Sequence, residues 1–167
     1  MLDILAAIVA GGAIKHVDYL EDKKKGKGIL KWPLGILAGI CMGYILAYSP
    51  AAVLFVGIIG AQVLMGKIDR PVHGLAVVLA AAVPFFLGME WANAELLIPF
   101  FVVAALDEVE FAGVLKPMRD YRLWLKGTTL AVGAISGVWS YFVILMAFDL
   151  AYLGVSKLKD GGSIVDV

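Results

Sequence analysis

The sequence predicts an all-α integral membrane protein, a bundle of six transmembrane helices that forms one polytopic domain over residues 1–167. Hydrophobic residues make up 62% of the chain and charged residues 17%, with a mean hydropathy of +0.92. Soluble domains carry about 45–50% apolar and about 25% charged residues. The apolar residues form runs close to the roughly 20 residues that a helix needs to cross the hydrocarbon core. We therefore expect a multi-pass protein of the cell membrane.

The six helices are predicted to cover the apolar runs, near residues 2–22, 29–48, 51–68, 72–89, 95–114 and 128–155. The first run has no basic start and no small-residue cleavage pattern, so it is expected to be a helix and not a secretory signal. Ser49 and Pro50 form a tight turn after the second helix, and Pro71 suits the first turn of the fourth. Pro117 ends the fifth helix, and an amphipathic interfacial segment at 118–126 leads to the sixth.

A row of small residues runs along the second helix, where Gly35, Gly39 and Gly43 are spaced four apart. Such a row lets two helix backbones approach closely, and close packing replaces the hydrophobic driving force that helices lack in lipid. Gly133 and Gly137 form a similar pair in the sixth helix. The row predicts either close packing within the chain or a homodimer through Gly35, Gly39 and Gly43.

Lys and Arg residues are concentrated in the first, third and fifth loops, which share one side of the membrane if six helices cross it. Twelve of the 14 basic residues belong to these loops and their flanks, whereas the loops around Ser49 and between Glu90 and Glu95 contain none. An excess of Lys and Arg in short loops marks the cytoplasmic side. Both termini are therefore predicted on the non-cytoplasmic side, with the two remaining basic residues, Lys157 and Lys159, in the C-terminal tail.

Neutral polar residues are scarce, since the chain has one Asn, one Gln and two Thr. Low Asn and Gln content is typical of proteins from thermophiles. Polar chemistry is therefore expected from charged residues, from Tyr, Trp and His, or from the backbone. The lone cysteine, Cys41, excludes intramolecular disulfides and cysteine-based metal sites.

Six carboxylates end the three helices that run inward, so all are expected at the cytoplasmic side of the bilayer. They are Asp18 and Asp22 in the first helix, Asp69 after the third, and Asp107, Glu108 and Glu110 in the fifth. Both histidines, His16 and His73, belong to the same layer. Acids at a helix C-terminus oppose the helix dipole, and ionisable residues at membrane depth are candidates for function. This layer is the predicted functional site.

The spacing of the acids favours a metal site. Asp18 and Asp22 are four residues apart and Asp107 and Glu110 three apart, so each pair lies on one helical face. If these helices face one another, the four carboxylates are expected to hold a divalent cation. Mg²⁺ or Mn²⁺ is the expected ion because both prefer oxygen ligands.

Basic residues surround the acidic layer and predict contacts with phosphate. The candidate headgroup-binding residues are Lys24, Arg119, Arg122 and Lys126. Carboxylates that hold a metal beside Lys and Arg fit a phosphate- or diphosphate-bearing lipid as substrate. Asp69 and His73 are the candidate catalytic residues, with His73 transferring protons. Membrane lipids are the expected partners, and no nucleic acid is expected.

Structural roles are an alternative for the same residues. Asp18 and Asp22 can pair with neighbouring lysines, Asp69 can cap the fourth helix, and His73 can be a packing residue. The basic residues can serve topology and contacts with anionic headgroups alone. The acids also fit the entrance of a cation or proton transporter or channel, or docking residues of a non-catalytic scaffold subunit. Enzyme, transporter and scaffold are thus the three candidate classes.

Overall fold

The computed structural model describes residues 1–22, 28–89, 91–109, 117–118 and 121–160. Within these residues the fold is all-α, with seven α-helices, one short 3₁₀ turn and no strands. The elements are α1 (Leu2–Asp22), α2 (Lys31–Tyr48), α3 (Ala52–Leu64), α4 (Pro71–Leu87), η1 (Ala94–Leu96), α5 (Leu97–Glu108), α7 (Leu123–Ser136) and α8 (Ser140–Asp160). Two of them, α2 and α8, are long and apolar enough to cross a membrane.

Helix α4 illustrates how the sequence sets a helix boundary. Pro71 occupies the first helical position, where its missing N–H costs nothing, and Arg70 before it is extended, as residues before proline usually are. At the other end Gly88 has a φ of 87° and donates its N–H to the carbonyl of Pro84. Only glycine adopts such a conformation without steric cost, so the helix ends there.

The region predicted as one helix at 128–155 contains two helices, α7 and α8. Gly137 has a left-handed conformation with a φ of 75°, and its N–H donates to the carbonyl of Gly133. This is a common way for a helix to end. The two glycines therefore do not form a ridge for helix packing, because Gly133 lies against the ring of Trp139 and Gly137 ends α7.

The predicted amphipathic segment at 118–126 is corrected as well. Leu123–Lys126 forms the first turn of α7 and therefore belongs to the hairpin of α7 and α8, whereas residues 119–120 lie outside the described residues. The chain consequently has one more helix than the six expected among the residues that the structure describes.

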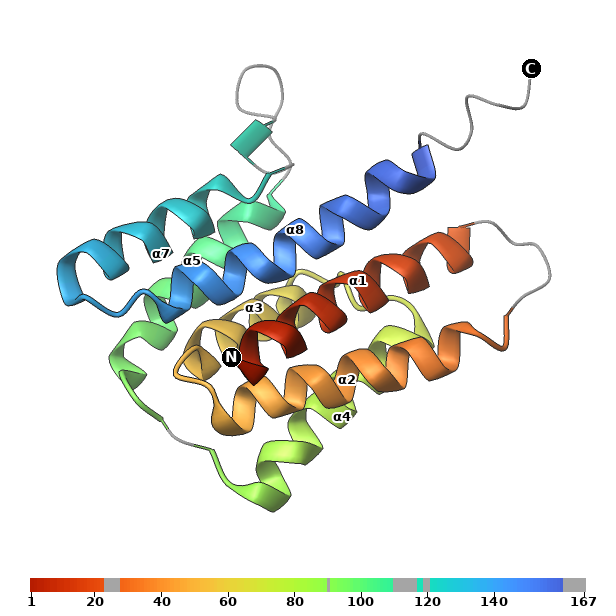
Figure 1. The fold of residues 1–167 in the computed structure, drawn as a ribbon, viewed down its shortest axis with the longest axis horizontal. Coiled ribbons are helices and arrows are strands. Elements are labelled where there is room, and N and C mark those ends of the chain that lie inside the picture. The colour runs from red at the N-terminus through yellow and green to blue at the C-terminus, as the bar shows by residue number, and fades with distance from the viewer. Residues whose placement is uncertain (23–27, 90, 110–116, 119–120, 161–167) are drawn as a thin grey trace.

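The additional helix changes where the two ends of the chain lie. Helices α1 and α8 are parallel neighbours, since Gly11 packs against the backbone of Phe148 and the hydroxyl of Tyr152 donates to Asp18. The start of α1 and the end of α8 thus lie at opposite ends of the bundle (Figure 1). The expectation that both termini share one side does not hold.

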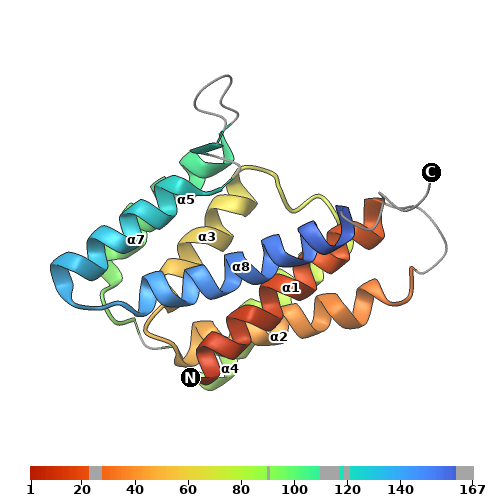
Figure 2. The same cartoon turned by 45° about the horizontal axis from the view of Figure 1, so that its top comes forward.

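Four helices form one layer in the order α8, α1, α2 and α4 (Figure 1). Helices α3, α5 and α7 lie against this layer, with α7 packed on α8 and α3 packed on α2 (Figure 2). Successive contacts connect α1, α2, α3, α5, α7 and α8 and return to α1, and α4 packs along α2.

The glycine row of α2 faces α4. A Cβ atom placed on Gly39 would lie 2.7 Å from the carbonyl oxygen of Ala76, and one placed on Gly43 would lie 2.6 Å from the Cβ of Val83. The two backbones are therefore as close as the small-residue spacing predicts. Helix α4 covers Gly35, Gly39 and Gly43, so this row packs within the chain and is not accessible to a second copy.

The apolar core fills the half of the bundle near the start of α1. Phe55, Phe100 and Tyr141 are fully buried and belong to the first turns of α3, α5 and α8. The rings of Phe55 and Phe148 meet edge to face at 5.8 Å, and those of Phe100 and Tyr141 lie 5.2 Å apart. Asn93 donates a hydrogen bond of 2.8 Å to the hydroxyl of Tyr141. Aromatic packing thus closes this half of the bundle.

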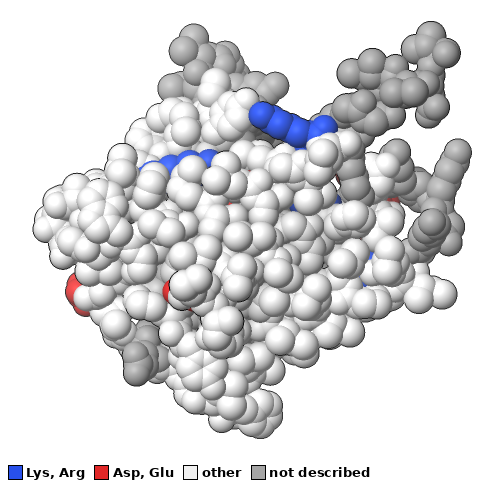
Figure 3. All heavy atoms as spheres, in the orientation of Figure 1, with Lys and Arg blue, Asp and Glu red and all other residues white. Residues whose placement is uncertain are grey.

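The opposite end of the bundle carries six of the seven described basic side chains, and we call it the basic end. It comprises the last turns of α1, α3, α5 and α8 and the first turns of α2, α4 and α7, with Lys31, Lys67, Arg70, Arg122, Lys126 and Lys157. By contrast, uncharged atoms dominate the face formed by α8, α1, α2 and α4 (Figure 3).

Candidate functional site

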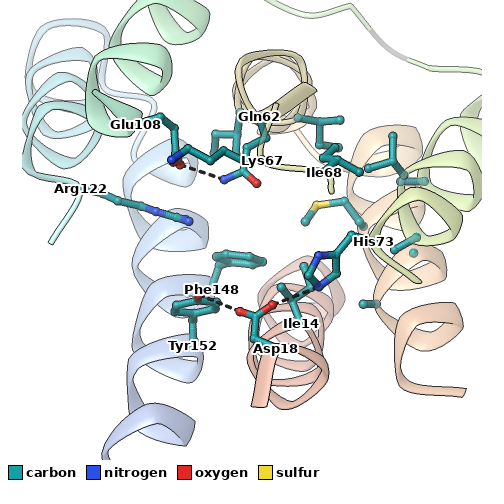
Figure 4. A pocket seen from close by; sticks show the side chains of 18 residues that line it. Ile14, Asp18, Gln62, Lys67, Ile68, His73, Glu108, Arg122, Phe148 and Tyr152 are labelled. Carbon is teal, nitrogen blue, oxygen red and sulfur yellow. Dashed lines mark hydrogen bonds and ion pairs between the residues drawn. The ribbon is translucent and has the colours of Figure 1, made fainter. Parts of the chain in front are cut away.

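A cavity of about 260 Å³ lies among α1, α2, α3, α4 and α8 in the half of the bundle toward the basic end. Its polar wall is formed by Asp18, Gln62, Lys67, His73, Glu108, Arg122 and Tyr152 (Figure 4). About one helical turn deeper, its apolar wall is formed by Ile14, Met42, Ile58, Ala76, Ala80 and Phe148. The cavity is therefore amphipathic, with charges toward the basic end and an apolar floor toward the middle of the helices.

Asp18 is the centre of one side of the polar wall. One carboxylate oxygen accepts a hydrogen bond of 2.9 Å from the hydroxyl of Tyr152, and the other lies 3.0 Å from Nε2 of His73 (Figure 4). The second contact has the distance of an ion pair without the alignment of a hydrogen bond, so the buried Nε2 makes no hydrogen bond to a described residue. Three helices, α1, α4 and α8, thus meet at one carboxylate.

Glu108 is the centre of the facing side. Its carboxylate accepts a hydrogen bond of 3.1 Å from the side-chain amide of Gln62, and Nζ of Lys67 lies 3.9 Å from its other oxygen. The Lys67 contact is long, and the Lys67 side chain is 41% exposed. The ammonium group is therefore only weakly engaged by Glu108 and is near enough to meet a ligand in the cavity (Figure 4).

Arg122 joins the cavity to a buried ion pair on α8. Its Nη1 donates to Asp149 at 3.4 Å, and its guanidinium carbon lies 5.7 Å from the centre of the Tyr152 ring. Asp149 is only 3% exposed and also contacts Nζ of Lys126 at 2.9 Å. Because Asp149 and Tyr152 are three residues apart on α8, they fix the guanidinium from one helical face. Arg122 is thereby directed at the cavity.

Asp107 has a structural role. It is 3% exposed and accepts hydrogen bonds from the backbone N–H groups of Trp124, at 3.2 Å, and Leu125, at 2.9 Å. These N–H groups belong to the first turn of α7 and have no acceptor within the helix. Asp107 therefore caps α7 from the end of α5, at a helix N-terminus where a negative charge is favoured. It does not line the cavity that contains Asp18.

The predicted site residues are distributed as follows. Asp18 and His73 meet in the cavity, and Arg122 lines it. Asp22 is exposed at the end of α1, and Asp69 is exposed in the α3–α4 connection, 3.5 Å from Arg70. Lys126 pairs with Asp149. The remaining three, Lys24, Arg119 and Glu110, lie outside the described residues.

The predicted metal ligands do not converge in the described part of the chain, which contains no group of three His, Cys, Asp or Glu side chains placed to hold a metal ion. Asp18 contacts Tyr152 and His73, whereas Asp107 binds backbone N–H groups. In addition, Tyr152 and Lys67 were not among the predicted site residues, and Glu108 was placed in the acidic layer without a role. Tyr152 lies one helical turn after Asp149, on the same face of the helix. This spacing beside an acidic residue could have indicated that Tyr152 belongs to the site.

A scan against models of protein families finds no match, and searches of curated proteins and of solved structures find none either.

Proposed function

We propose that the chain is a multi-pass protein of the cell membrane in which all seven described helices lie in the bilayer. Helices α2 and α8 meet the length and hydropathy that a crossing requires. The other helices expose large apolar side chains, among them Ile8, Leu64, Val78, Phe85, Phe86, Ile98 and Ile135. Soluble monomers rarely expose continuous apolar surface on this scale. Lipid contact accounts for this exposure on every side of the bundle.

The proposed orientation follows from the basic end. With seven crossings, each of the 14 Lys and Arg residues belongs to a helix end, a loop or a tail on the same side of the membrane. The positive-inside rule makes that side cytoplasmic. The N-terminus is then outside and the C-terminus inside. With six crossings Lys157 and Lys159 would lie on the outer side, whereas with seven they lie on the same side as the other basic residues.

Reporter fusions in a bacterial host test this topology. A green fluorescent protein fused after Val167 is expected to fluoresce, and alkaline phosphatase fused there is expected to be inactive, because phosphatase folds only outside the cytoplasm. Phosphatase fused in the connection between α4 and α5, at Gly88, is expected to be active. An active phosphatase at Val167 would support six crossings and contradict the seven-helix arrangement.

We further propose that the cavity binds the phosphate-bearing part of an amphipathic molecule. The observation that carries this proposal is the placement of three donors with a positive or protonatable group, Lys67, His73 and Arg122, on the wall of one amphipathic cavity. Charge-assisted hydrogen bonds from such groups are the strongest available to a phosphate. The apolar floor provides for the rest of the ligand, as is usual in pockets with a few polar groups.

A reaction on this molecule fits the cavity better than transport or scaffolding. His73 can transfer a proton while Asp18 orients it, and Tyr152 in turn holds Asp18. Asp18 and Glu108 both line the cavity, and they would be the carboxylates available to Mg²⁺ or Mn²⁺ brought in by a diphosphate. A pore requires a polar path through the half of the bundle that Phe55 and Phe100 fill. A scaffold requires acids that point outward, whereas Asp18 and Glu108 face the cavity.

A binding measurement with a water-soluble amphiphile tests the proposed ligand. Dihexanoyl phosphatidic acid is titrated into the purified protein in detergent, with and without Mg²⁺, for wild type and Lys67→Gln. Loss of one charge-assisted hydrogen bond, worth about 1.5–3 kcal/mol, is expected to weaken binding about tenfold or more. Lys157→Gln is the matched control, since Lys157 does not line the cavity. Equal affinities for the two variants would contradict the proposal.

A further inference from the structure

Helices α3 and α4 follow one another in the chain but do not pack along each other. Helix α3 lies along α5 and α2, and α4 lies along α2 alone (Figures 1 and 2). Short connections usually bring consecutive helices into contact as antiparallel neighbours. Here the connection at residues 65–70 instead spans the two helices at the basic end. The wall of the bundle is therefore incomplete between α3 and α4.

The cavity reaches this incomplete wall. Ile59 of α3 and Val77 of α4 both line it, and both are partly exposed. One turn beyond Ile59, the side chain of Val63 is 56% exposed, and Val78, next to Val77, is 63% exposed. The apolar floor of the cavity is thus continuous with exposed apolar surface on the second half of α3 and near the middle of α4. At that depth the surroundings of a membrane protein are acyl chains and not water.

The polar wall begins at the same opening. Lys67 and Ile68, both in the α3–α4 connection, line the cavity where it approaches the basic end. A lysine at this level can keep its ammonium group at the headgroup layer while its methylene chain covers apolar surface. A lipid whose chains lie in the bilayer would therefore bring its phosphate to Lys67 first, with His73 and Arg122 farther inside.

The volume of the cavity limits what it encloses. Pockets that enclose a drug-sized ligand measure about 300–1,000 Å³, and this cavity measures about 260 Å³. A complete two-chain lipid does not fit. A phosphate headgroup and the beginning of one chain do, provided that the remaining chain atoms leave through a side opening.

We infer that the ligand is a phosphate-bearing membrane lipid that enters from the bilayer between α3 and α4. Its headgroup contacts Lys67, His73 and Arg122, and its chains extend past Ile59 and Val77 into the membrane. This inference depends on the proposed phosphate-binding function and adds the source of the ligand. A free phosphate compound would instead reach the polar wall from the cytoplasm and gain nothing from the apolar opening.

Two probes with the same headgroup separate these sources: dioleoyl phosphatidic acid and glycerol 3-phosphate. Both are titrated into the purified full-length protein in detergent. Because each buried methylene contributes about 0.8 kcal/mol, even two enclosed chain carbons are expected to favour the lipid about tenfold or more. In Val77→Trp, with an indole in the opening, this preference is expected to fall about tenfold. Ile59→Trp narrows the opening from the other helix and is expected to give the same result.

Ile135→Trp is the matched control, because Ile135 is 88% exposed on α7 and does not line the cavity. It is expected to leave both affinities at their wild-type values. Equal affinity for the two probes in the wild-type protein would overturn the lateral route while leaving the proposed phosphate site intact. The lateral route would also be overturned if Val77→Trp and Ile59→Trp both kept the wild-type preference for the lipid over glycerol 3-phosphate. Failure of both probes to bind would overturn the phosphate site itself.

Discussion

Replacement of Asp149 by alanine is expected to lower the free energy of unfolding by about 3–5 kcal/mol, the usual effect of removing one member of a buried ion pair. Asp149 is almost completely buried and contacts both Arg122 and Lys126, whose side chains are 22% and 16% exposed. Without the carboxylate, two cations remain in a site with little access to water. Equilibrium unfolding of the purified protein in mixed micelles measures the change.

A triple variant separates the charge from the packing at this position. When Asp149→Leu is combined with Arg122→Met and Lys126→Met, all three charges are absent. Apolar replacement of a complete buried ion pair is often neutral or stabilising. We expect the triple variant to be at least about 2 kcal/mol more stable than Asp149→Ala. An Asp149→Ala protein as stable as wild type would mean that water already solvates the two cations.

Gly39→Leu is expected to have the second largest effect, a loss of about 1–3 kcal/mol or more through overpacking. A side chain there meets the carbonyl oxygen of Ala76 at 2.7 Å and its Cα at 3.0 Å, so α4 must move away from α2. Helix α4 makes most of its contacts with α2, and few contacts with other helices hold it in position. His73 moves with α4, and we therefore also expect weaker binding of dihexanoyl phosphatidic acid.

Gly74→Leu on α4 is the control for this substitution. A Cβ at Gly74 has no heavy atom within 4 Å, so the added side chain meets open space. Replacing a glycine inside a helix by leucine is expected to be neutral or to stabilise by up to about 1 kcal/mol. Equal unfolding free energies for Gly39→Leu and Gly74→Leu would contradict the close approach of α2 and α4.

The sequence allowed the first helices to be predicted closely, because their apolar runs end at charged residues or at Pro50. The hairpin of α7 and α8 was missed for a local reason. A glycine within an apolar helix costs only about 1 kcal/mol, and the spacing of Gly133 and Gly137 is also typical of helix packing. The left-handed conformation of Gly137 shows that the pair ends a helix and does not form a packing ridge. That conformation accompanies the packing of Trp139 against Gly133, which the sequence does not reveal.

The candidate site was predictable in part. The predicted end of the first helix and the predicted start of the fourth placed Asp18 and His73 at the same end of the bundle, and these two residues do meet. The partners of Asp107 did not follow, because Leu125 is 18 positions farther along the chain and belongs to the first turn of α7, a helix that was not predicted. In the segment Leu106–Phe111, Asp107 caps a neighbouring helix and Glu108 lines the cavity, so adjacent acids have different roles. Such a division depends on which side of the helix each residue faces.

The parallel contact of α1 and α8 has a consequence for biosynthesis. Asp18 is translated 134 positions before its partner Tyr152. Helix α1 is therefore made long before α8, and its Gly11 surface stays uncovered until α8, the last of the described helices, follows. A nascent or truncated chain that stops before Tyr152 contains most of the bundle and none of the completed pocket.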